Sequence, residues 1–235
     1  MEHRHFDTID STNEQLKRFL SNGERDLLLT ASQQTAGRGR RGHTFHSVKG
    51  GLYLSMDLPY EPAEEIPITI LAGAACSMAL TELCEREVSC KWVNDLLLDG
   101  KKVGGILAEL HQGRVVLGIG INVNQSAKDF PPELAHASSL KRCCNRSFDL
   151  EIVCRTVLKK WSEVQQNKNK AFCWYKNHLL NLHRRVRVCS ALGERFGTAI
   201  DLQKDGALLL HFEDSGVVES IQSAEVFIRG IDSYM

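Results

Sequence analysis

The spacing of apolar and polar residues predicts a chain that mixes helices with strands. Leu16, Phe19 and Leu20 fall on one face of a helix. Ser11 and Glu14 before them have the spacing of a capping box, so this helix is predicted to follow Ser11. Apolar residues also predict helices over residues 68–87, 150–164 and 171–180. The first of these is apolar on most sides, so it is expected to pack against a sheet.

Strands are predicted where apolar residues run together or alternate with polar ones. Residues 26–32 are predicted to form a buried strand, and the alternation from 52 to 58 indicates a strand with one buried face. Asp99-Gly100 and Gln112-Gly113 lie between apolar runs and favour tight hairpins. The other strands predicted in this part of the chain cover residues 5–9, 88–92, 96–98, 103–110 and 115–124.

The pattern changes after about residue 181. Five short strand-like runs follow with turns between them, which indicates a small β-barrel. We therefore predict an α+β fold in two domains. Residues 1–181 would form a mixed β-sheet flanked by helices, and residues 182–235 a small C-terminal β-barrel.

Composition and charge exclude some classes of protein. The 235 residues are 43% hydrophobic and 25% charged, as in an ordinary globular chain. A net charge of zero argues against a nucleic-acid partner, which usually requires a basic face. The chain shows no signal-peptide pattern and no apolar run of the ~20 residues that a membrane helix needs. Its eight cysteines form no C-x-x-C pair, so we expect a reduced, cytoplasmic protein with no metal site and no membrane partner.

The stretch "GRGRRG" at residues 37–42 is the first candidate for chemistry. Glycine lets the backbone approach a ligand, and Arg38, Arg40 and Arg41 carry permanent charges suited to carboxylates and phosphates. The letters also match G-x-G-x-x-G, but no helix is predicted to follow the glycines, so the dinucleotide-binding interpretation is rejected. The loop is predicted to close on an anion.

A second candidate lies at Lys91, at the end of an apolar strand. A lysine there is costly unless an anion meets it. Its alternatives are an outward-pointing side chain or a pair with Asp95. Gly104-Gly105 indicates a close backbone approach, and Asn122 stands at the end of a strand, where polar side chains often face a ligand.

Taken in order, "STN" (residues 11–13), "QTAGRGRRGHTF", "KWVND", "KKVGGILAE" and "GIGINVN" resemble the successive motifs of the biotin–protein ligases. The resemblance covers nearly the whole chain. It implies an ATP-dependent enzyme that joins biotin and ATP into biotinyl-5′-AMP. The biotinyl group would then pass to one lysine of a biotin carboxyl carrier domain, as in acetyl-CoA carboxylase.

The resemblance also implies roles for individual residues. Lys91 and Arg40 are expected to be catalytic, with Lys91 acting through its charge and not as a nucleophile. The residues expected to bind biotin are Ser11, Thr12, Asn13, Gln34, Gly37, Arg38, Lys91, Gly105 and Leu107. Those expected to bind ATP or the adenylate are Arg38, Gly39, Arg40, Arg41, Lys91 and Asn122. Mg²⁺ would accompany ATP, held mainly by phosphate oxygens. The protein is expected to be a monomer or a weak homodimer.

Three positions depart from the family pattern. His43 stands where arginine or lysine is common, Phe45 where tryptophan is, and Val93 where proline is. Because "STN" begins at residue 11, the chain is expected to be the non-regulatory form without an N-terminal DNA-binding domain. Two alternatives stay open: a lipoate–protein ligase or octanoyltransferase, and a nucleic-acid-binding module that uses the arginine loop.

Overall fold

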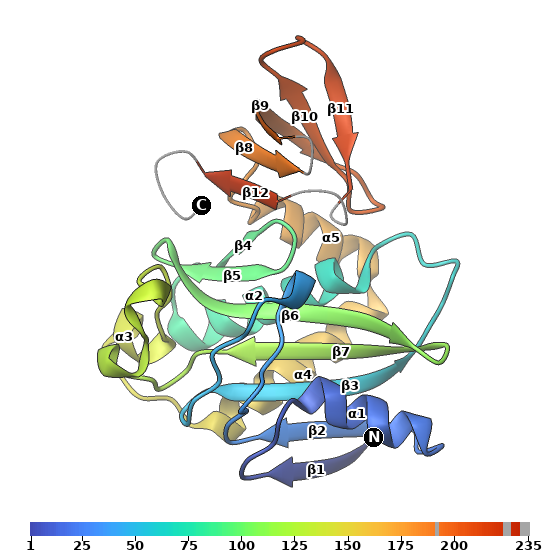
Figure 1. Ribbon diagram of the computed structural model, residues 1–235, viewed down its shortest axis with the longest axis vertical. Helices are drawn as coiled ribbons and strands as arrows, with labels where there is room; N and C mark the ends of the chain where they lie inside the picture. The colour runs from blue at the N-terminus through green and yellow to red at the C-terminus, as the bar shows by residue number, and fades with distance from the viewer. Residues whose placement is uncertain (191–192, 223–226, 231–235) are drawn as a thin grey trace.

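The computed structural model describes residues 1–190, 193–222 and 227–230, which form two β-sheets with helices packed on the larger one (Figure 1). The strands of the larger sheet are β1 (Glu2–Phe6), β2 (Leu27–Ala31), β3 (Leu52–Pro59), β4 (Ser89–Lys91), β5 (Asp95–Leu98), β6 (Lys101–His111) and β7 (Arg114–Ile121). Their order across the sheet is β1-β2-β3-β7-β6-β5-β4. β1 and β2 are parallel and the other neighbours are antiparallel, so the predicted mixed sheet is confirmed.

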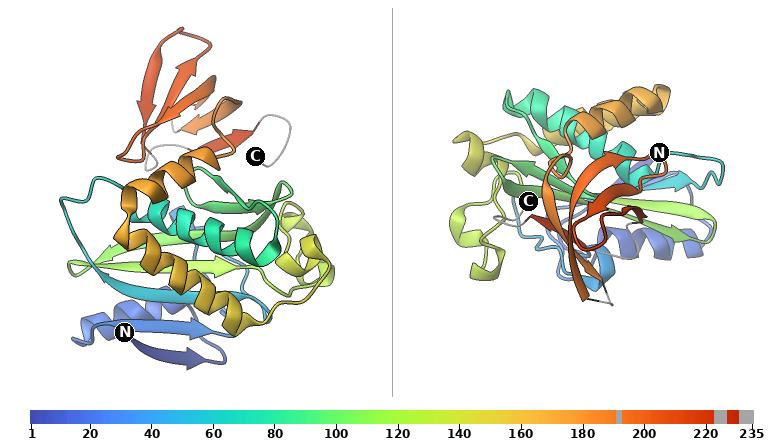
Figure 2. Two further views of the ribbon diagram at one scale, coloured as in Figure 1. Left: turned by 180° about the vertical axis from the view of Figure 1, so that it is seen from behind. Right: turned by 90° about the horizontal axis from the view of Figure 1, so that it is seen from above.

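Helices cover both faces of this sheet. The long helices α2 (Ile68–Cys84) and α4 (Leu150–Gln166) and the shorter α5 (Lys168–Asn177) pack together behind it, as Figure 2 shows. On the other face α1 (Thr12–Ser21) lies over β2, β3 and β7. A short helix, α3 (Leu140–Cys144), lies at one end of the sheet. The main apolar core therefore lies between the sheet and α2, α4 and α5, with a smaller core under α1.

Both predicted hairpins are present. Asp99 and Gly100 have φ angles of 53° and 71°, and Gln112 and Gly113 have φ angles of 48° and 73°. Two consecutive positive φ angles are what a two-residue hairpin loop needs to match the twist of its strands. These two turns place β5, β6 and β7 side by side in the sheet.

Two details of the predicted strands are wrong. The first strand runs from Glu2 to Phe6 and not over residues 5–9. The strand over residues 52–58 is buried on both faces and not on one. Helix α1 covers the second face, where the Ser55 hydroxyl lies 2.6 Å from Asn13 Oδ1 and the Arg114 guanidinium donates to both carboxylate oxygens of Asp57. These polar side chains are buried because each has a partner.

The C-terminal strands form a separate antiparallel sheet. They are β8 (Arg185–Ser190), β9 (Gly193–Leu202), β10 (Leu208–Phe212), β11 (Val218–Ile221) and β12 (Phe227–Gly230), in the order β11-β10-β9-β8-β12. All five predicted strands are therefore found, and the α+β fold class is confirmed. The side chains of β12 and residues 231–235 lie outside the described part of the chain.

The two sheets are joined by specific contacts around Trp92. Its indole N–H donates to the carbonyl of Gly206 at 2.9 Å, and its backbone N–H donates to Asn181 Oδ1 at 2.7 Å. Apolar residues of the C-terminal strands continue the main core. The small sheet is thus seated firmly on the larger one, and the domain boundary near residue 181 stays a prediction.

Candidate functional site

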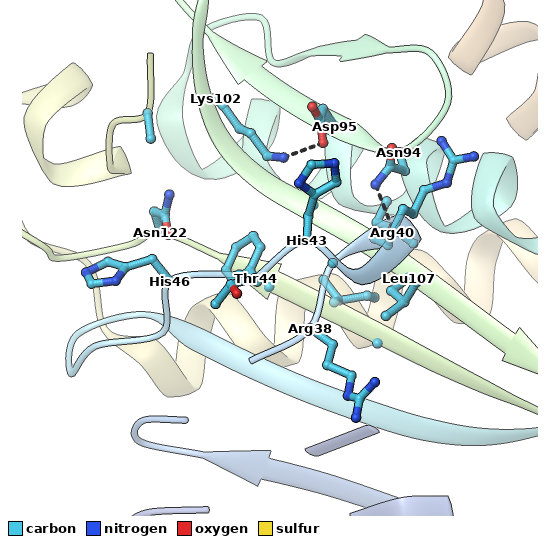
Figure 3. Close-up of a pocket in the computed structure, with 18 of the residues that line it drawn as sticks. Arg38, Arg40, His43, Thr44, His46, Asn94, Asp95, Lys102, Leu107 and Asn122 are labelled. Atoms are coloured by element: carbon cyan, nitrogen blue, oxygen red, sulfur yellow. Dashed lines mark hydrogen bonds and ion pairs between the residues drawn. The ribbon is translucent and has the colours of Figure 1, made fainter. Parts of the chain in front are cut away.

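A cavity of about 600 Å³ opens on the α1 side of the larger sheet. Its walls come from the N-terminus of α1, the segment 38–46, the strands β4 to β7, the segment 134–137 and β8. The 38–46 segment crosses in front of β6 and β7 and closes one side of the cavity (Figure 3). Elements far apart in the sequence therefore meet around one space.

Side-chain amides and hydroxyls form one end of the cavity. The Thr12 backbone N–H and hydroxyl both donate to Gln34 Oε1, at 2.8 and 3.1 Å. The Gln34 amide in turn donates to Ser47 Oγ at 2.8 Å. Ser11 caps α1 through its side chain, which accepts from the Glu14 backbone N–H. Each polar group is held in one orientation by another, which suits recognition of a small polar ring.

The backbones of β6 and β7 and the ring of Phe45 lie against each other inside the cavity. A Cβ on Gly120 would lie 2.6 Å from Phe45 Cε1, and a Cβ on Gly105 would lie 3.4 Å from Phe45 Cε2. Only glycine at residue 120 allows the ring this close. The edge of the ring faces Tyr53, with centroids 6.3 Å apart. Phe45 therefore ties the loop to the sheet.

Charged side chains gather at the other end. Lys91 ends β4 and is 6% exposed, and Lys102 Nζ lies 2.6 Å from Asp95 Oδ1. Figure 3 shows the His43 side chain beside this ion pair. Burial, followed by the positive charge of Lys102, lowers the pKa of His136, so its ring is neutral at pH 7.

The arginines of the loop point in different directions. Arg40 is half-buried, and burial together with the neighbouring Arg41 charge lowers the pKa of its guanidinium. Arg38 turns away from the other labelled charges (Figure 3) and its Nε lies 3.0 Å from the Glu14 carboxylate. Gly37 is buried, and a Cβ there would lie 2.4 Å from the Phe45 carbonyl oxygen. Its role here is to let two stretches of backbone approach.

Most residues singled out in the sequence line this cavity. They are Ser11, Thr12, Asn13, Gln34, Arg38, Gly39, Arg40, Lys91, Gly105, Leu107 and Asn122. Gly37 and Arg41 do not. Their expected contact with a ligand is therefore not supported by this geometry, because Gly37 is covered by Phe45 and Ser47 and Arg41 is turned to the surface.

Sequence reasoning missed four charged or titratable residues that line the cavity: Asp95, Lys102, His136 and Arg187. A register shift near Leu97 in the β5–β6 pairing puts Lys102 on the same face as Gly105, which regular alternation would not do. A predicted hairpin with a bulge is the signal that could have found Lys102. Nothing in the sequence indicated that His136 or Arg187 lies here.

The charges of the cavity favour an anionic ligand. Five basic residues line it (Arg38, Arg40, Lys91, Lys102 and Arg187), against one acidic residue, Asp95. The described residues contain no group of three or more His, Cys, Asp or Glu that could hold a metal ion. No helix in the described ranges is long and apolar enough to cross a membrane.

Comparison with known proteins gives consistent matches. The model of the biotin/lipoate A/B protein ligase family matches residues 5–126. The bifunctional ligase/repressor BirA of Bacillus subtilis is 31% identical, covering 94% of this chain and 72% of that protein. The biotin–[acetyl-CoA-carboxylase] ligase of Mycobacterium tuberculosis is 31% identical over 83% of this chain and 76% of that protein. The structure of biotin protein ligase from Aquifex aeolicus in complex with biotin and ATP is 32% identical, with a TM-score of 0.85 over 98% of this chain and 99% of that one.

Proposed function

We infer that this chain, which belongs to the biotin/lipoate A/B protein ligase family, is an ATP-dependent biotin–protein ligase. It would activate biotin as biotinyl-5′-AMP and transfer the biotinyl group to a lysine of a biotin carboxyl carrier domain. The observation that carries this inference is the cavity itself. It has a fixed amide and hydroxyl cluster at one end and a strong excess of basic side chains elsewhere.

The first step joins two anions, which is what the basic side chains would make possible. A biotin carboxylate oxygen attacks the α-phosphorus of ATP, and the bond from that phosphorus to the bridging oxygen of the β-phosphate breaks. Pyrophosphate leaves with the bonding electrons. Lys91 and Arg40 would lie at the reacting groups and Lys102 beside them, lowering the repulsion between carboxylate and phosphate.

We propose that the amide and hydroxyl end holds the biotin ring system. Thr12 and Gln34 are already fixed to each other, so little side-chain entropy is lost when a ligand binds. Asn13 donates to Glu109 Oε2 at 2.8 Å and lies under the same end. The glycines of β6 and β7 leave room for a flat ligand against the backbone.

The nucleotide would lie toward Asn122 and the loop. His43 is a weaker permanent charge than the arginine or lysine common at that position, and Phe45 keeps an aromatic face without an indole N–H. No cluster of metal-ligating side chains is found among the described residues, so we propose no protein-held metal. Mg²⁺ would be held by the phosphate oxygens of ATP.

In the second step the acceptor lysine amine attacks the carbonyl carbon of the mixed anhydride, and AMP leaves. The amine must lose a proton as the amide bond forms. We propose that the acceptor is a carrier domain of acetyl-CoA carboxylase or a related biotin enzyme. We also propose that the protein works in the cytoplasm as a monomer or weak homodimer, without a nucleic-acid partner.

The test is transfer of radiolabelled biotin to a purified carrier domain. Label should appear on the carrier only when ATP is present, and pyrophosphate should be released when biotin and ATP are supplied without the carrier. Lipoate is the control substrate, because the family contains both kinds of ligase. Transfer of lipoate in preference to biotin would contradict the proposal.

A further inference from the structure

Arg187 stands apart from the other basic residues of the cavity because it comes from the second sheet. It lies in β8, opposite Phe196 of β9, and lines the cavity with Trp92 and Asn94 of the larger sheet. Its neighbour on the same face of β8, Arg185, does not line the cavity. One side chain of the small sheet is therefore directed at the reaction site.

The position of Arg187 is fixed by the contacts between the sheets. Trp92 follows Lys91 directly and donates its indole N–H to Gly206 at 2.9 Å. Gly206 also packs on the start of α2, since a Cβ there would lie 2.8 Å from Pro67 Cγ. The small sheet is thus held against the segment that carries Lys91, and Arg187 is held over the cavity.

The other cations of the cavity leave a task for Arg187. Lys102 pairs with Asp95 at 2.6 Å and Arg38 with Glu14 at 3.0 Å, whereas Arg187 has a longer ion pair of 3.4 Å with Glu194. Glu194 is 52% exposed, so water screens this pair and a polyphosphate can compete for the arginine.

ATP brings two phosphates that take no part in the bond to biotin. If Lys91 and Arg40 meet the carboxylate and the α-phosphate, the β- and γ-phosphates need a further cation outside that group. Resting on the proposed function, we propose that Arg187 binds the β- and γ-phosphates of ATP and holds the pyrophosphate as it leaves. The guanidinium is suited to this because it contacts two phosphate oxygens at once.

The experiment compares Arg187→Ala with Arg185→Ala, a matched control two residues earlier on the same face of the same strand. Arg187→Ala should raise the KM for ATP about tenfold or more, the loss expected for one charge-assisted contact, and leave the KM for biotin unchanged. Arg185→Ala should leave both KM values at the wild-type level. Arg187→Lys should restore part of the ATP affinity, because it keeps the charge and loses the two-point contact.

A second measurement bypasses ATP. When biotinyl-5′-AMP is supplied directly, Arg187→Ala should biotinylate the carrier domain at the wild-type rate, since the adenylate has no β- or γ-phosphate. A slower transfer from the adenylate, or an unchanged KM for ATP, would overturn the proposal. If wild-type protein releases no pyrophosphate from ATP and biotin, the proposed function itself fails, and that result is separate from the behaviour of Arg187. Melting curves of the variants check that each is folded.

Discussion

Replacing Lys91 by methionine tests the charge at the centre of the cavity while keeping most of the side-chain volume. Lys91 is 6% exposed, so its ammonium is largely removed from water and its contacts are little screened. A charge-assisted hydrogen bond contributes roughly 1.5–3 kcal/mol. At 1.36 kcal/mol per tenfold change in rate, its loss from the transition state should slow adenylation by about 10- to 150-fold.

The assay is the rate of pyrophosphate release from ATP and biotin at saturating concentrations of both. The control is Lys101→Met, because Lys101 is exposed and does not line the cavity. Lys91→Met should melt within ~4 °C of wild type, since methionine fills the space of the lysine stem without leaving a buried charge. Adenylation by Lys91→Met at the wild-type rate, with folding intact, would refute the role given to this residue.

Three further predictions concern the cavity walls. Gly118→Ala would place a Cβ 2.2 Å from Asn13 Oδ1, so Asn13 must move and the KM for biotin should rise about tenfold, with the KM for ATP as the internal control. Arg40→Gly should loosen the loop that keeps water and other proteins from the adenylate, so released biotinyl-5′-AMP should label lysines of an unrelated protein. If this variant forms adenylate but labels the bystander no more than wild type, the loop is not a lid. Burial lowers the pKa of His136, so the unfolded state takes up a proton first as the pH falls, and stability should be lost below about pH 6.5. Urea unfolding from pH 5 to 8 should show a smaller loss for His136→Gln than for wild type.

The hairpins could be predicted because their signal is local. Asp99-Gly100 and Gln112-Gly113 determine the turn geometry within two residues, and nothing distant alters it. The strand over residues 52–58 was harder, because alternation alone indicates one solvent-facing side. Its second face is covered by α1, which lies about 40 residues earlier in the chain. A local pattern does not contain that contact.

The site shows the same limit. Gly37 and Gly39 look alike in "GRGRRG", yet only Gly39 lines the cavity, because the chain folds back and places Phe45 and Ser47 against Gly37. Lys102 was missed because one register shift moves a side chain to the opposite face of a strand. The motifs identified which segments meet, and tertiary packing decides which atom of each segment faces the ligand.

The bond from Trp92 to Gly206 matters to anyone who wants a shorter version of this enzyme. The division after residue 181 suggests that the last quarter of the chain could be deleted as a module. Deletion would leave the buried indole N–H without its acceptor, at a cost of about 1–3 kcal/mol, and would open the apolar surface beside it to water. That damage would fall on the residue next to Lys91. A minimal ligase built on this scaffold should therefore keep the small sheet and be shortened elsewhere.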